Sequence, residues 1–408
     1  MGVFKDDFNG ENFMSGPLEG LRVLELARTL AGPYCGMMLA DMGAEVIKVE
    51  QPGVGDETRG YSPPEMNGES TYYLSLNRNK KGITANLKSK EGQRIVKELV
   101  KKSDILIENF RYGAMEKFGL DYEKLKEINP RLIYCAVTAF GRTGPMKSEP
   151  GYDLLLQGFG GIMSVTGEAN GLPMRVGFSI VDLTTAIYAS NAILLALLVR
   201  EKTGRGQYVE TSLMESIISL QCYHAQGVFA TGQPPGRFGT GHPNIVPYQV
   251  FETKDNYIII AVPNDWLWKK MCSAIGMEDL MDDPRFATNA SRVAHRDLLI
   301  SSMLKVTKAQ SASDILERLH QAGVPSGPVN DISQALAHPQ VAHRDMIQEV
   351  QHPTIGPLKL LGLPMKLAET PGSIRMPPPL LGQHTIEVLK GLGYGDQEIQ
   401  HLRDSGTI

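Results

Sequence analysis

The chain has 408 residues, of which 42% are hydrophobic and 21% are charged. This is the composition of a globular protein with enough length for two domains or one large one. A formal net charge of -4 provides no overall basic field that would attract nucleic acid, so an anionic ligand has to be met by local basic groups. We expect a small anionic ligand and no nucleic-acid partner.

Four cysteines, at positions 35, 135, 222 and 272, are far apart and form no CxxC pair. This spacing fits neither a disulfide framework nor a zinc site, so we expect a cytoplasmic protein without a metal. The N-terminus lacks the basic-then-apolar layout of a signal peptide. The longest apolar run, residues 186–199, contains Tyr188, Ser190 and Asn191 and is too short to span a bilayer, so no membrane partner is expected.

Candidate strands and helices alternate along the first half of the chain. The strands are predicted at residues 21–26, 44–50, 104–108, 131–138 and 207–212, and the helices at 34–42, 92–102, 122–128 and 183–201. The first strand, helix and strand together have the length of a βαβ unit. The alternation predicts an α/β fold with an open, mostly parallel, Rossmann-like sheet that carries helices on both faces.

A second, smaller α+β domain is predicted where the composition shifts to glycine and proline, at residues 233–242. It would hold a β-hairpin over residues 248–262, turning at 254–256, followed by helices. The sequence GVPSGP at 323–328 is typical of a linker back. We therefore predict a large domain at 1–225, a small domain at 226–328, and a return segment at 329–408 whose C-terminal helix packs on the large domain.

Several common ligand-binding motifs are missing from the chain. The turn after the first predicted strand reads ARTLAGP in place of GxGxxG, which argues against a dinucleotide oxidoreductase. GxxxxGK[ST], HExxH and GxSxG do not occur either. Walker-type ATPases, HExxH metalloproteases and serine α/β-hydrolases therefore lose their main support.

Basic and amide side chains gather in predicted loops that follow candidate strands. They lie at residues 77–81, at 109–111, at Lys117 and at Arg59. Loops at the carboxyl ends of parallel strands hold ligands in α/β sheets, and Lys and Arg in such loops suit phosphates. Each of these residues taken singly is more often a solvated surface charge, so only their grouping indicates a phosphorylated ligand.

Asp182 stands in GFSIVDLTTA, where apolar residues lead into the long predicted helix. An Asp at this place can be a helix N-cap, because its oxygens accept backbone N–H bonds. A carboxylate half-withdrawn from water is also a stronger nucleophile, or a base with a raised pKa. Both interpretations fit Asp182 equally well, and Asp153 in GYDLLLQ raises the same question, with a simple turn as its alternative.

A set of longer segments occurs in a defined order over residues 18–390. They include LEGLRVLELARTLAGPYCGMMLADMGAEVIKVEQPGVGDETR, STYYLSLNRNKK, GYDLLLQGFGGIMSVTG, VDLTTAIYA, REKTGRGQYVETSL and PPPLLGQHT. In this order they resemble the family III CoA-transferases, also called the CaiB/BaiF family, which include carnitine and bile-acid CoA-transferases and α-methylacyl-CoA racemase. The resemblance covers nearly the whole chain.

The resemblance implies a nucleophilic Asp before a helix that ends in an REKTGRGQ-like turn, and Asp182 lies eighteen positions before Arg200 as this pattern requires. It implies that the Asp182 carboxylate attacks an acyl-CoA thioester to give a mixed anhydride. An aspartyl-CoA thioester then forms, which an acceptor acid attacks. Such a site has to stabilise oxyanions and exclude water, and Gly239, Thr240 and Gly241 are expected to supply backbone N–H groups and a lid.

Coenzyme A, bound as an acyl-CoA substrate, is the cofactor that the resemblance implies. The family's CoA contacts correspond here to Arg28, Thr29, Leu30, Ala31, Gln51, Asn86, Lys88, Asn109, Phe110, Arg111 and Lys117. Tyr152 and Asp153 correspond to residues beside the reacting acyl group. Gln51 replaces an arginine that is frequent in the family, so the resemblance implies that the contact of this arginine with coenzyme A is either weaker here or taken over by Arg59.

The identity of residue 152, a tyrosine, helps to decide between the CoA-transferase and racemase activities that occur in the family. In its racemases a His at this position shares proton exchange with the residue equivalent to Asp182. Tyrosine, with an unperturbed pKa near ~10, is a poor base at neutral pH. We therefore rank a CoA-transferase above a racemase, and both above a non-catalytic CoA-binding protein, in which Asp182 would have no role.

The resemblance also bears on substrates and assembly. STYYLSLNRNKK, HPNIVPYQ and RMPPPLLGQHT resemble the succinyl-CoA:hydroxymethylglutarate type, which implies succinyl-CoA or a similar donor and a carboxylic or dicarboxylic acid as acceptor. A distal carboxylate requires a cation, and the candidates are Arg59, Arg175, Arg237 and His242. A homodimer of interlocked, ring-shaped chains is implied as well.

Overall fold

The structure, a computed structural model, describes residues 16–408, which divide into two compact units. The first unit takes up the chain to residue 160, then 177–222 and 339–408; the second takes up 161–176 and 223–338. The sequence-based division differs in three places. It left 161–176 and 223–225 in the large domain, and it ended the small domain at 328 instead of 338.

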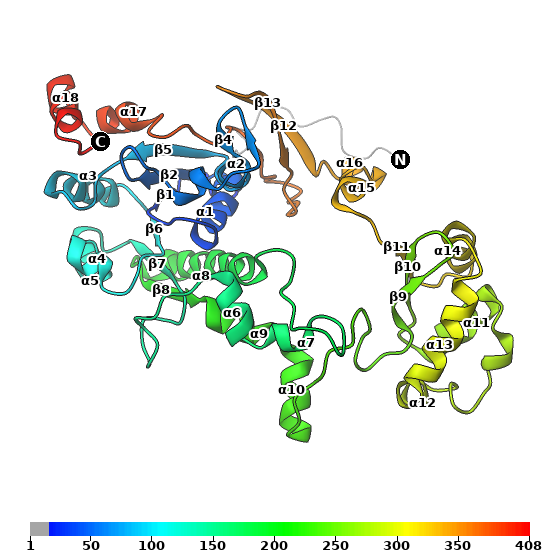
Figure 1. Ribbon diagram of the computed structural model, residues 1–408. Coiled ribbons are helices and arrows are strands. Elements are labelled where there is room, and N and C mark those ends of the chain that lie inside the picture. Colours follow the sequence, from blue (N-terminus) through cyan, green and yellow to red (C-terminus); the bar gives the residue numbers. More distant parts are fainter. Residues whose placement is uncertain (1–15) are drawn as a thin grey trace. The chain divides into compact units, whose positions relative to one another are not determined.

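The first unit is built on a six-stranded sheet in which all neighbours are parallel. The strand order is β5-β2-β1-β6-β7-β8, so the chain moves outward from β1 in one direction and then from β6 in the other (Figure 1). The strands are β1 (Arg22–Glu25), β2 (Glu45–Glu50), β5 (Lys80–Thr84), β6 (Ile105–Glu108), β7 (Ile133–Thr138) and β8 (Tyr208–Ser212). This confirms the predicted α/β class with a parallel sheet.

Helices cover both faces of this sheet because successive residues of a strand point to opposite sides. Val23 of β1 belongs to the core that includes α1 (Ala31–Asp41) and α8 (Ile180–Thr203). Leu24 belongs to the opposite core, formed with α3 (Lys90–Lys101), α5 (Tyr122–Ile128), α17 (Thr385–Gly391) and α18 (Asp396–Asp404). In Figure 1, α17 lies above β5 and α1 lies below it.

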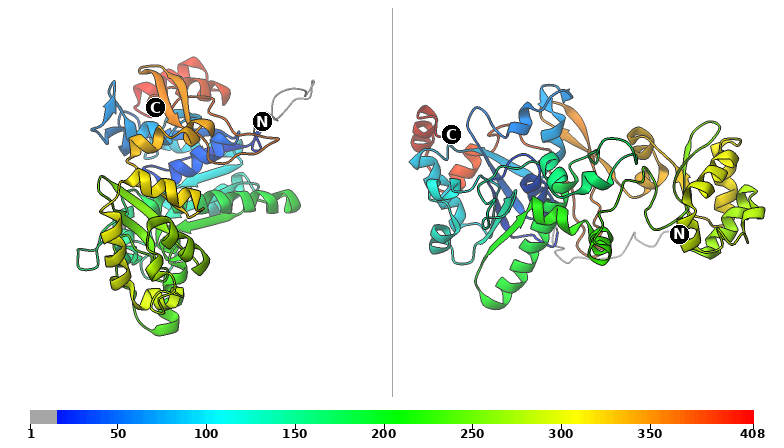
Figure 2. Two further views of the ribbon diagram at one scale, coloured as in Figure 1. Left: turned by 90° about the vertical axis from the view of Figure 1, so that its right-hand side faces the viewer. Right: turned by 60° about the horizontal axis from the view of Figure 1, so that its bottom comes forward.

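The remaining elements of the first unit are short. They are η1 (Glu57–Gly60), β3 (Glu65–Met66), β4 (Glu69–Ser70), α2 (Thr71–Leu76), α4 (Ala114–Phe118), α6 (Asp153–Phe159), α9 (Leu213–Ser219), α16 (Pro339–His343), β12 (Ile347–His352) and β13 (Gly356–Leu361). The long helix α8 and the strands of the sheet can be followed in both views of Figure 2.

The interpretation of residues 77–81 as a ligand-binding loop was wrong. Lys80 begins the edge strand β5, and the side chains of Arg78 and Lys80 are buried. Arg78 Nη2 lies 2.6 Å from Asp41 Oδ2, and Lys80 Nζ lies 3.0 Å from Glu25 Oε2. These cations are paired inside the protein, with carboxylates that are distant in the sequence.

The second unit has a core of its own, which includes Phe251 and Trp268. The predicted hairpin is confirmed, since β9 (Tyr248–Glu252) pairs antiparallel with β10 (Tyr257–Ala261), and β11 (Ser326–Pro328) adds a third antiparallel strand. The helices of this unit are α7 (Ile162–Val165), α11 (Asp265–Ile275), η2 (Glu278–Leu280), α12 (Asn289–Ala294), α13 (Arg296–Thr307), α14 (Ala312–Gln321) and α15 (Ile332–Leu336). Helix α10 (Cys222–Thr231) begins at the boundary between the units.

Candidate active site

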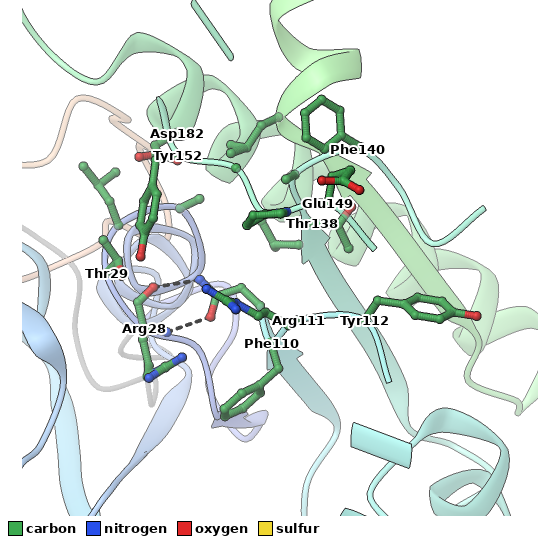
Figure 3. A pocket seen from close by; sticks show the side chains of 18 of the residues that line it. Arg28, Thr29, Phe110, Arg111, Tyr112, Thr138, Phe140, Glu149, Tyr152 and Asp182 are labelled. Carbon is green, nitrogen blue, oxygen red and sulfur yellow. Dashed lines mark hydrogen bonds between the residues drawn. The ribbon is translucent and has the colours of Figure 1, made fainter. Parts of the chain in front are cut away.

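A pocket in the first unit opens at the carboxyl ends of β1, β6 and β7 (Figure 3). Its lining comes from residues 28–31 after β1, from 109–112 after β6 and from 137–140 at the end of β7, together with Tyr152 and Asp182. The strand order changes direction between β1 and β6. Ligands of open α/β sheets bind at such a point, outside the carboxyl ends of the strands.

The turns after β1 and β6 are tied to each other at this point. The N–H of Arg28 donates to Asn109 Oδ1 at 2.9 Å, and Asn109 Nδ2 donates to the carbonyl of Arg28 at 2.7 Å. The next residue, Thr29, has a φ of 69°, which is uncommon for a β-branched residue. Its N–H donates to Asp56 Oδ1 at 3.2 Å, and its Oγ1 donates to Glu57 at 2.8 Å.

Asp182 lies in the first turn of α8, where Ser179 occupies the N-cap position. The N–H groups of Val181 and Asp182 donate to Oδ2 of Asp153, at 2.8 and 3.2 Å. Asp153 is buried at the start of α6, and it caps α8 from a neighbouring element. The N-cap interpretation of Asp182 was therefore wrong. Its own carboxylate belongs to the pocket lining.

The Asp182 carboxylate is half-buried and uncompensated. Among residues 16–408 no group donates a hydrogen bond to it or forms an ion pair with it. Burial, and then the negative charge of Asp153, raise the pKa of Asp182 to about 7. Burial and the negative charge of Asp182 in turn raise the pKa of Tyr72 to about 12. Asp182 is therefore more basic, and more nucleophilic when ionised, than an ordinary Asp.

The same pocket also carries four cationic side chains: Arg28, Arg111, Arg142 and Lys147. The guanidinium of Arg28 lies 5.3 Å from the centre of the Phe110 ring. Arg142 pairs with the buried carboxylate of Glu108. Cations next to an aromatic ring suit a ligand that combines phosphates with a flat base.

Tyr152 and Asp182 both line the pocket and are labelled in Figure 3. A carboxylate with a raised pKa can attack a carbonyl carbon or take up a proton, and the cations can hold phosphates. Within residues 16–408 no group of three or more His, Cys, Asp or Glu is placed to hold a metal ion. The arrangement suits nucleophilic acyl chemistry on a phosphorylated substrate.

The pocket brings many of the sequence-predicted residues together. Those in its lining are Arg28, Thr29, Leu30, Ala31, Asn109, Phe110, Arg111, Tyr152 and Asp182. The lining does not include Gln51, Asn86, Lys88 or Lys117. Gln51 and Asn86 follow β2 and β5 at the same edge of the sheet, Lys88 is exposed just beyond them, and Lys117 lies on α4.

The remaining candidates lie elsewhere. Arg59 Nε and Nη2 donate to Glu50 at 2.7 and 2.8 Å, and its guanidinium lies 3.7 Å over the Tyr73 ring, so its charge is already paired. The other candidates belong to the second unit: Arg175, Arg237, Gly239, Thr240, Gly241 and His242. Arg237 there donates to backbone carbonyls, including that of Gly171.

Sequence reasoning missed the lining that follows β7. Thr138, Phe140, Arg142, Lys147 and Glu149 all lie in or after the end of this strand. The strand itself was predicted, and the rule that ligands bind at the carboxyl ends of parallel strands would have drawn attention to its following loop.

Comparison with known proteins gives consistent matches over almost the whole chain. The model of CoA-transferase family III matches residues 18–385. The chain is 40% identical to succinyl-CoA:glutarate CoA-transferase of Homo sapiens, over 96% of this chain and 90% of that protein. It is 41% identical to succinate–glutarate CoA-transferase of Agrobacterium fabrum, over 92% of this chain and 96% of that protein. A crystal structure of a CaiB/BaiF family protein from Brucella suis, 40% identical, matches with a TM-score of 0.83, over 92% of this chain and 99% of that one.

Proposed function

This chain belongs to CoA-transferase family III, and on that premise we propose that it moves coenzyme A from succinyl-CoA to a dicarboxylic acid through covalent intermediates on Asp182. The observation that carries the proposal is one pocket that combines an uncompensated carboxylate with four cations. The two relatives named for succinyl-CoA or succinate and glutarate support short dicarboxylic acids as donor and acceptor.

The first half-reaction loads coenzyme A onto the enzyme. A carboxylate oxygen of Asp182 attacks the thioester carbonyl carbon, the C–S bond breaks, and a mixed anhydride and CoA thiolate result. The thiolate then attacks the aspartyl carbonyl of the anhydride. The C–O bond to the donor acid breaks, so the donor acid leaves and an aspartyl-CoA thioester remains.

The second half-reaction is the same sequence in reverse with the acceptor. The acceptor carboxylate attacks the aspartyl thioester, which releases CoA thiolate and forms a new anhydride. The thiolate attacks the acceptor's acyl carbon, and the Asp182 carboxylate leaves in its original form. Protons and electrons balance without a co-reactant.

Each group of the pocket has a role in this scheme. Burial and Asp153 make Asp182 basic, while Asp153 occupies the N–H groups at the start of α8 that would otherwise stabilise the Asp182 charge. Arg28, Arg111 and Lys147 bind the phosphates of coenzyme A, whereas Arg142 is already paired with Glu108. Tyr152, which lines the same pocket as Asp182, contacts the acyl group.

A screen of acceptors tests the overall reaction. The protein is incubated with succinyl-CoA and dicarboxylic acids from oxalate to adipate, and the CoA esters are identified by mass spectrometry. We expect glutaryl-CoA and free succinate in equal amounts. Transfer to no acid would contradict the proposal, and deuterium uptake from heavy water at the α-carbon of a 2-methylacyl-CoA would indicate a racemase instead.

Hydroxylamine tests the covalent step. Added during turnover, it should convert Asp182 into a hydroxamate, because it attacks an activated aspartyl carbonyl. Peptide mass spectrometry locates the modified residue, and Asp182→Asn is the control that should stay unmodified. A hydroxamate at any other residue would refute the role of Asp182.

We also propose a homodimer whose partner covers the outer side of α8, in the interlocked form that the resemblance implies. This helix is the one element of residues 16–408 that is long and apolar enough to span a membrane, with a mean hydropathy of 1.6. Its inner side, including Ala189 and Ile193, is buried, but Leu195 and Leu198 are each 63% exposed. An apolar face of this kind marks an interface. The mass in solution should be that of a dimer, and Leu195→Glu with Leu198→Glu should give a monomer.

A reducing compartment, the cytoplasm, is part of the same proposal. Cys35, Cys135, Cys222 and Cys272 are all unpaired, and three of them are buried. Thiols in this state are typical of proteins in reducing compartments.

A further inference from the structure

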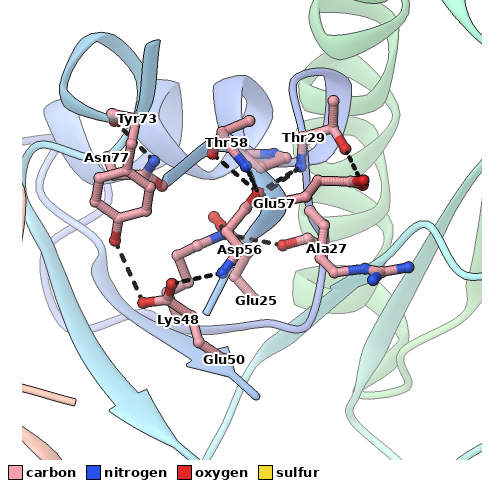
Figure 4. A network of polar contacts seen from close by, with 12 residues as sticks. Glu25, Ala27, Thr29, Lys48, Glu50, Asp56, Glu57, Thr58, Tyr73 and Asn77 are labelled. Carbon is pink, nitrogen blue, oxygen red and sulfur yellow. Dashed lines mark hydrogen bonds and ion pairs between the residues drawn. The ribbon is translucent and has the colours of Figure 1, made fainter. Parts of the chain in front are cut away.

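A buried ion cluster in the first unit is formed by Glu25, Lys48, Asp56 and Lys80. Figure 4 shows Glu25, Lys48 and Asp56 together with the pocket residue Thr29. Each of the four residues is at most 1% exposed. Lys48 Nζ lies 3.1 Å from Glu25 Oε1 and 2.9 Å from Asp56 Oδ2, and Lys80 Nζ lies 3.0 Å from Glu25 Oε2. The negative charges of two carboxylates are therefore compensated by two ammonium groups, and all four groups are buried away from water. None of the four lines the pocket.

Packing alone does not explain the buried ion cluster. Removing charges from water is costly, and well-packed apolar residues often stabilise a core as well as a buried ion pair does. Lys48 is also hydrogen-bonded to the carbonyl of Ala27, two residues before the pocket turn at Thr29. The cluster thus makes contact with the strand end that leads into the pocket.

Asp56 connects the cluster to that turn directly. Its carboxylate accepts the N–H of Thr29, at 3.2 Å to Oδ1 and 3.3 Å to Oδ2, and the N–H of Thr58 at 3.0 Å. Burial tends to raise the pKa of Asp56, but the charge of Lys48 and the Thr58 N–H hold it below its usual value. Asp56 is therefore ionised at working pH, and it is a strong acceptor for the Thr29 N–H.

The Thr29 backbone needs such a partner. A φ of 69° is unfavourable for a β-branched residue, and backbone strain of this kind persists where the surroundings enforce it, most often at functional sites. Thr29 stands between Arg28 and the N-terminus of α1, and residues 28–31 all line the pocket. Its conformation therefore sets where the Arg28 side chain and the first N–H groups of α1 point, and such N–H groups favour anions.

We propose that Asp56, anchored by Lys48 and Glu25, is a positioning residue that holds the strained backbone of Thr29 so that the turn after β1 binds the CoA part of the thioester. Asp56 does this without touching the substrate. The inference rests on the proposed function, because it takes coenzyme A as the occupant of this pocket.

Steady-state kinetics of Asp56→Asn with succinyl-CoA and glutarate test the proposal. The KM for succinyl-CoA should rise about tenfold, the loss expected for a charge-assisted hydrogen bond. The kcat and the KM for glutarate should stay within about twofold of wild type, since Asp182 is unchanged. An unchanged KM for succinyl-CoA, or equal losses in both KM values, would overturn the positioning role.

Asp41→Asn is the matched control. Asp41 is a buried carboxylate at the other end of α1, paired with Arg78, and it lies outside the pocket lining. The variant should lose thermal stability and keep its KM for succinyl-CoA. If it raises this KM as much as Asp56→Asn does, general destabilisation explains the effect and the inference fails.

A double-mutant cycle with Thr29→Gly examines the backbone itself. Glycine adopts a positive φ without strain, so Asp56→Asn should raise the KM less in the Thr29→Gly background than in wild type. Equal effects in both backgrounds would overturn the inference.

Should Asp56→Asn not fold, Thr29→Pro replaces it, because proline has no N–H and cannot take this φ. An unchanged KM in Thr29→Pro would then count against the proposal.

Calorimetry with coenzyme A on the wild-type protein separates the two levels of inference. If wild type neither binds coenzyme A nor transfers it, the proposed function fails and this inference fails with it. If wild type is active and Asp56→Asn has the same KM, only the positioning role is lost.

Discussion

Carboxylates withdrawn from water occur in two regions of the first unit, and the protein treats them differently. In the buried ion cluster, Asp56 is almost completely buried, yet Lys48 holds its pKa below the usual value in spite of that burial. At the pocket, Asp182 is only half-buried, but burial and the charge of Asp153 raise its pKa to about 7. Burial tends to raise the pKa of both carboxylates, so burial alone does not decide which of them is reactive. The decisive factor is whether a cation compensates the carboxylate.

The largest effect is expected from removing the uncompensated carboxylate. Asp182→Ala should reduce kcat for CoA transfer by about a thousandfold or more, because the covalent route is lost. Circular dichroism should show an intact fold. The matched control, Asp121→Ala, removes the N-cap of α5 outside the pocket and should keep normal activity. Near-normal transfer by Asp182→Ala would show that the uncompensated carboxylate is not the nucleophile, and the comparison with Asp56 would have no bearing on reactivity.

Removing a compensating cation should act on stability instead. Lys48→Met leaves Glu25 and Asp56 partly unpaired inside the protein, so the free energy of unfolding should fall by about 3–5 kcal/mol. Urea denaturation measures it. Lys101→Met, which breaks an exposed pair with Glu98, should cost little. Equal losses in the two variants would show that compensation in the buried ion cluster is unimportant.

Asp182 should make the protein less stable as pH rises, whereas a carboxylate with a lowered pKa such as Asp56 makes it more stable. Its folded-state pKa of about 7 lies above the ordinary value of about 3.9, so in this range the folded state binds more protons than the unfolded state. The contribution of Asp182 to stability therefore falls as pH rises from about 4 to about 7 and stays low above that.

The Asp182→Asn variant has no side chain that ionises at this position, so it does not lose stability for this reason as pH rises. It should be more stable than wild type at alkaline pH, by roughly 2 kcal/mol after allowance for partial solvation, and the difference should shrink toward acid pH. Urea denaturation of both proteins near pH 8 and near pH 4.5 measures the difference. If the variant gains more stability over wild type at pH 4.5 than at pH 8, the pKa of Asp182 is not raised in the folded protein.

The smallest effect concerns the neighbour of the nucleophile. Asp153→Asn keeps an oxygen for the N–H groups of Val181 and Asp182 but removes the negative charge that raises the pKa of Asp182. Since transfer needs the ionised nucleophile, the acid limb of the kcat profile should move to lower pH. Asp41→Asn should leave the limb in place. An unchanged acid limb would show that Asp153 acts only as a helix cap.

The predicted elements agree closely with the structure where local patterning suffices. The predicted strand at 104–108 became β6, and the predicted helix at 122–128 has the bounds of α5. Strands buried on both faces are continuous apolar runs, and amphipathic helices repeat their apolar residues at helical spacing. The pocket residues after β1 were found because the resemblance pointed to them, whereas residues 109–111 after β6 were also indicated by the grouping of basic and amide side chains in predicted loops.

Three cations that the sequence offered as ligand contacts are paired with carboxylates of other segments. Residues 77–81 carry charges that look like ligand contacts, but Arg78 and Lys80 are neutralised by Asp41 and Glu25. Arg59 is likewise paired, with Glu50. Neither the sign nor the number of charges in a segment reveals such partners.

By itself, the sequence determined the alternation of strands and helices along the first half of the chain apart from β5, and the parallel sheet. It also pointed to Asp182 as a candidate nucleophile, for which helix capping was an equally good interpretation. Only the tertiary structure decided that Asp153 caps α8 and leaves the Asp182 carboxylate to the pocket. The physical reason is the separation along the chain of the residues that interact. Secondary structure follows from periodic patterns of neighbouring residues, whereas compensation of a charge depends on the distance between side chains that the fold brings together.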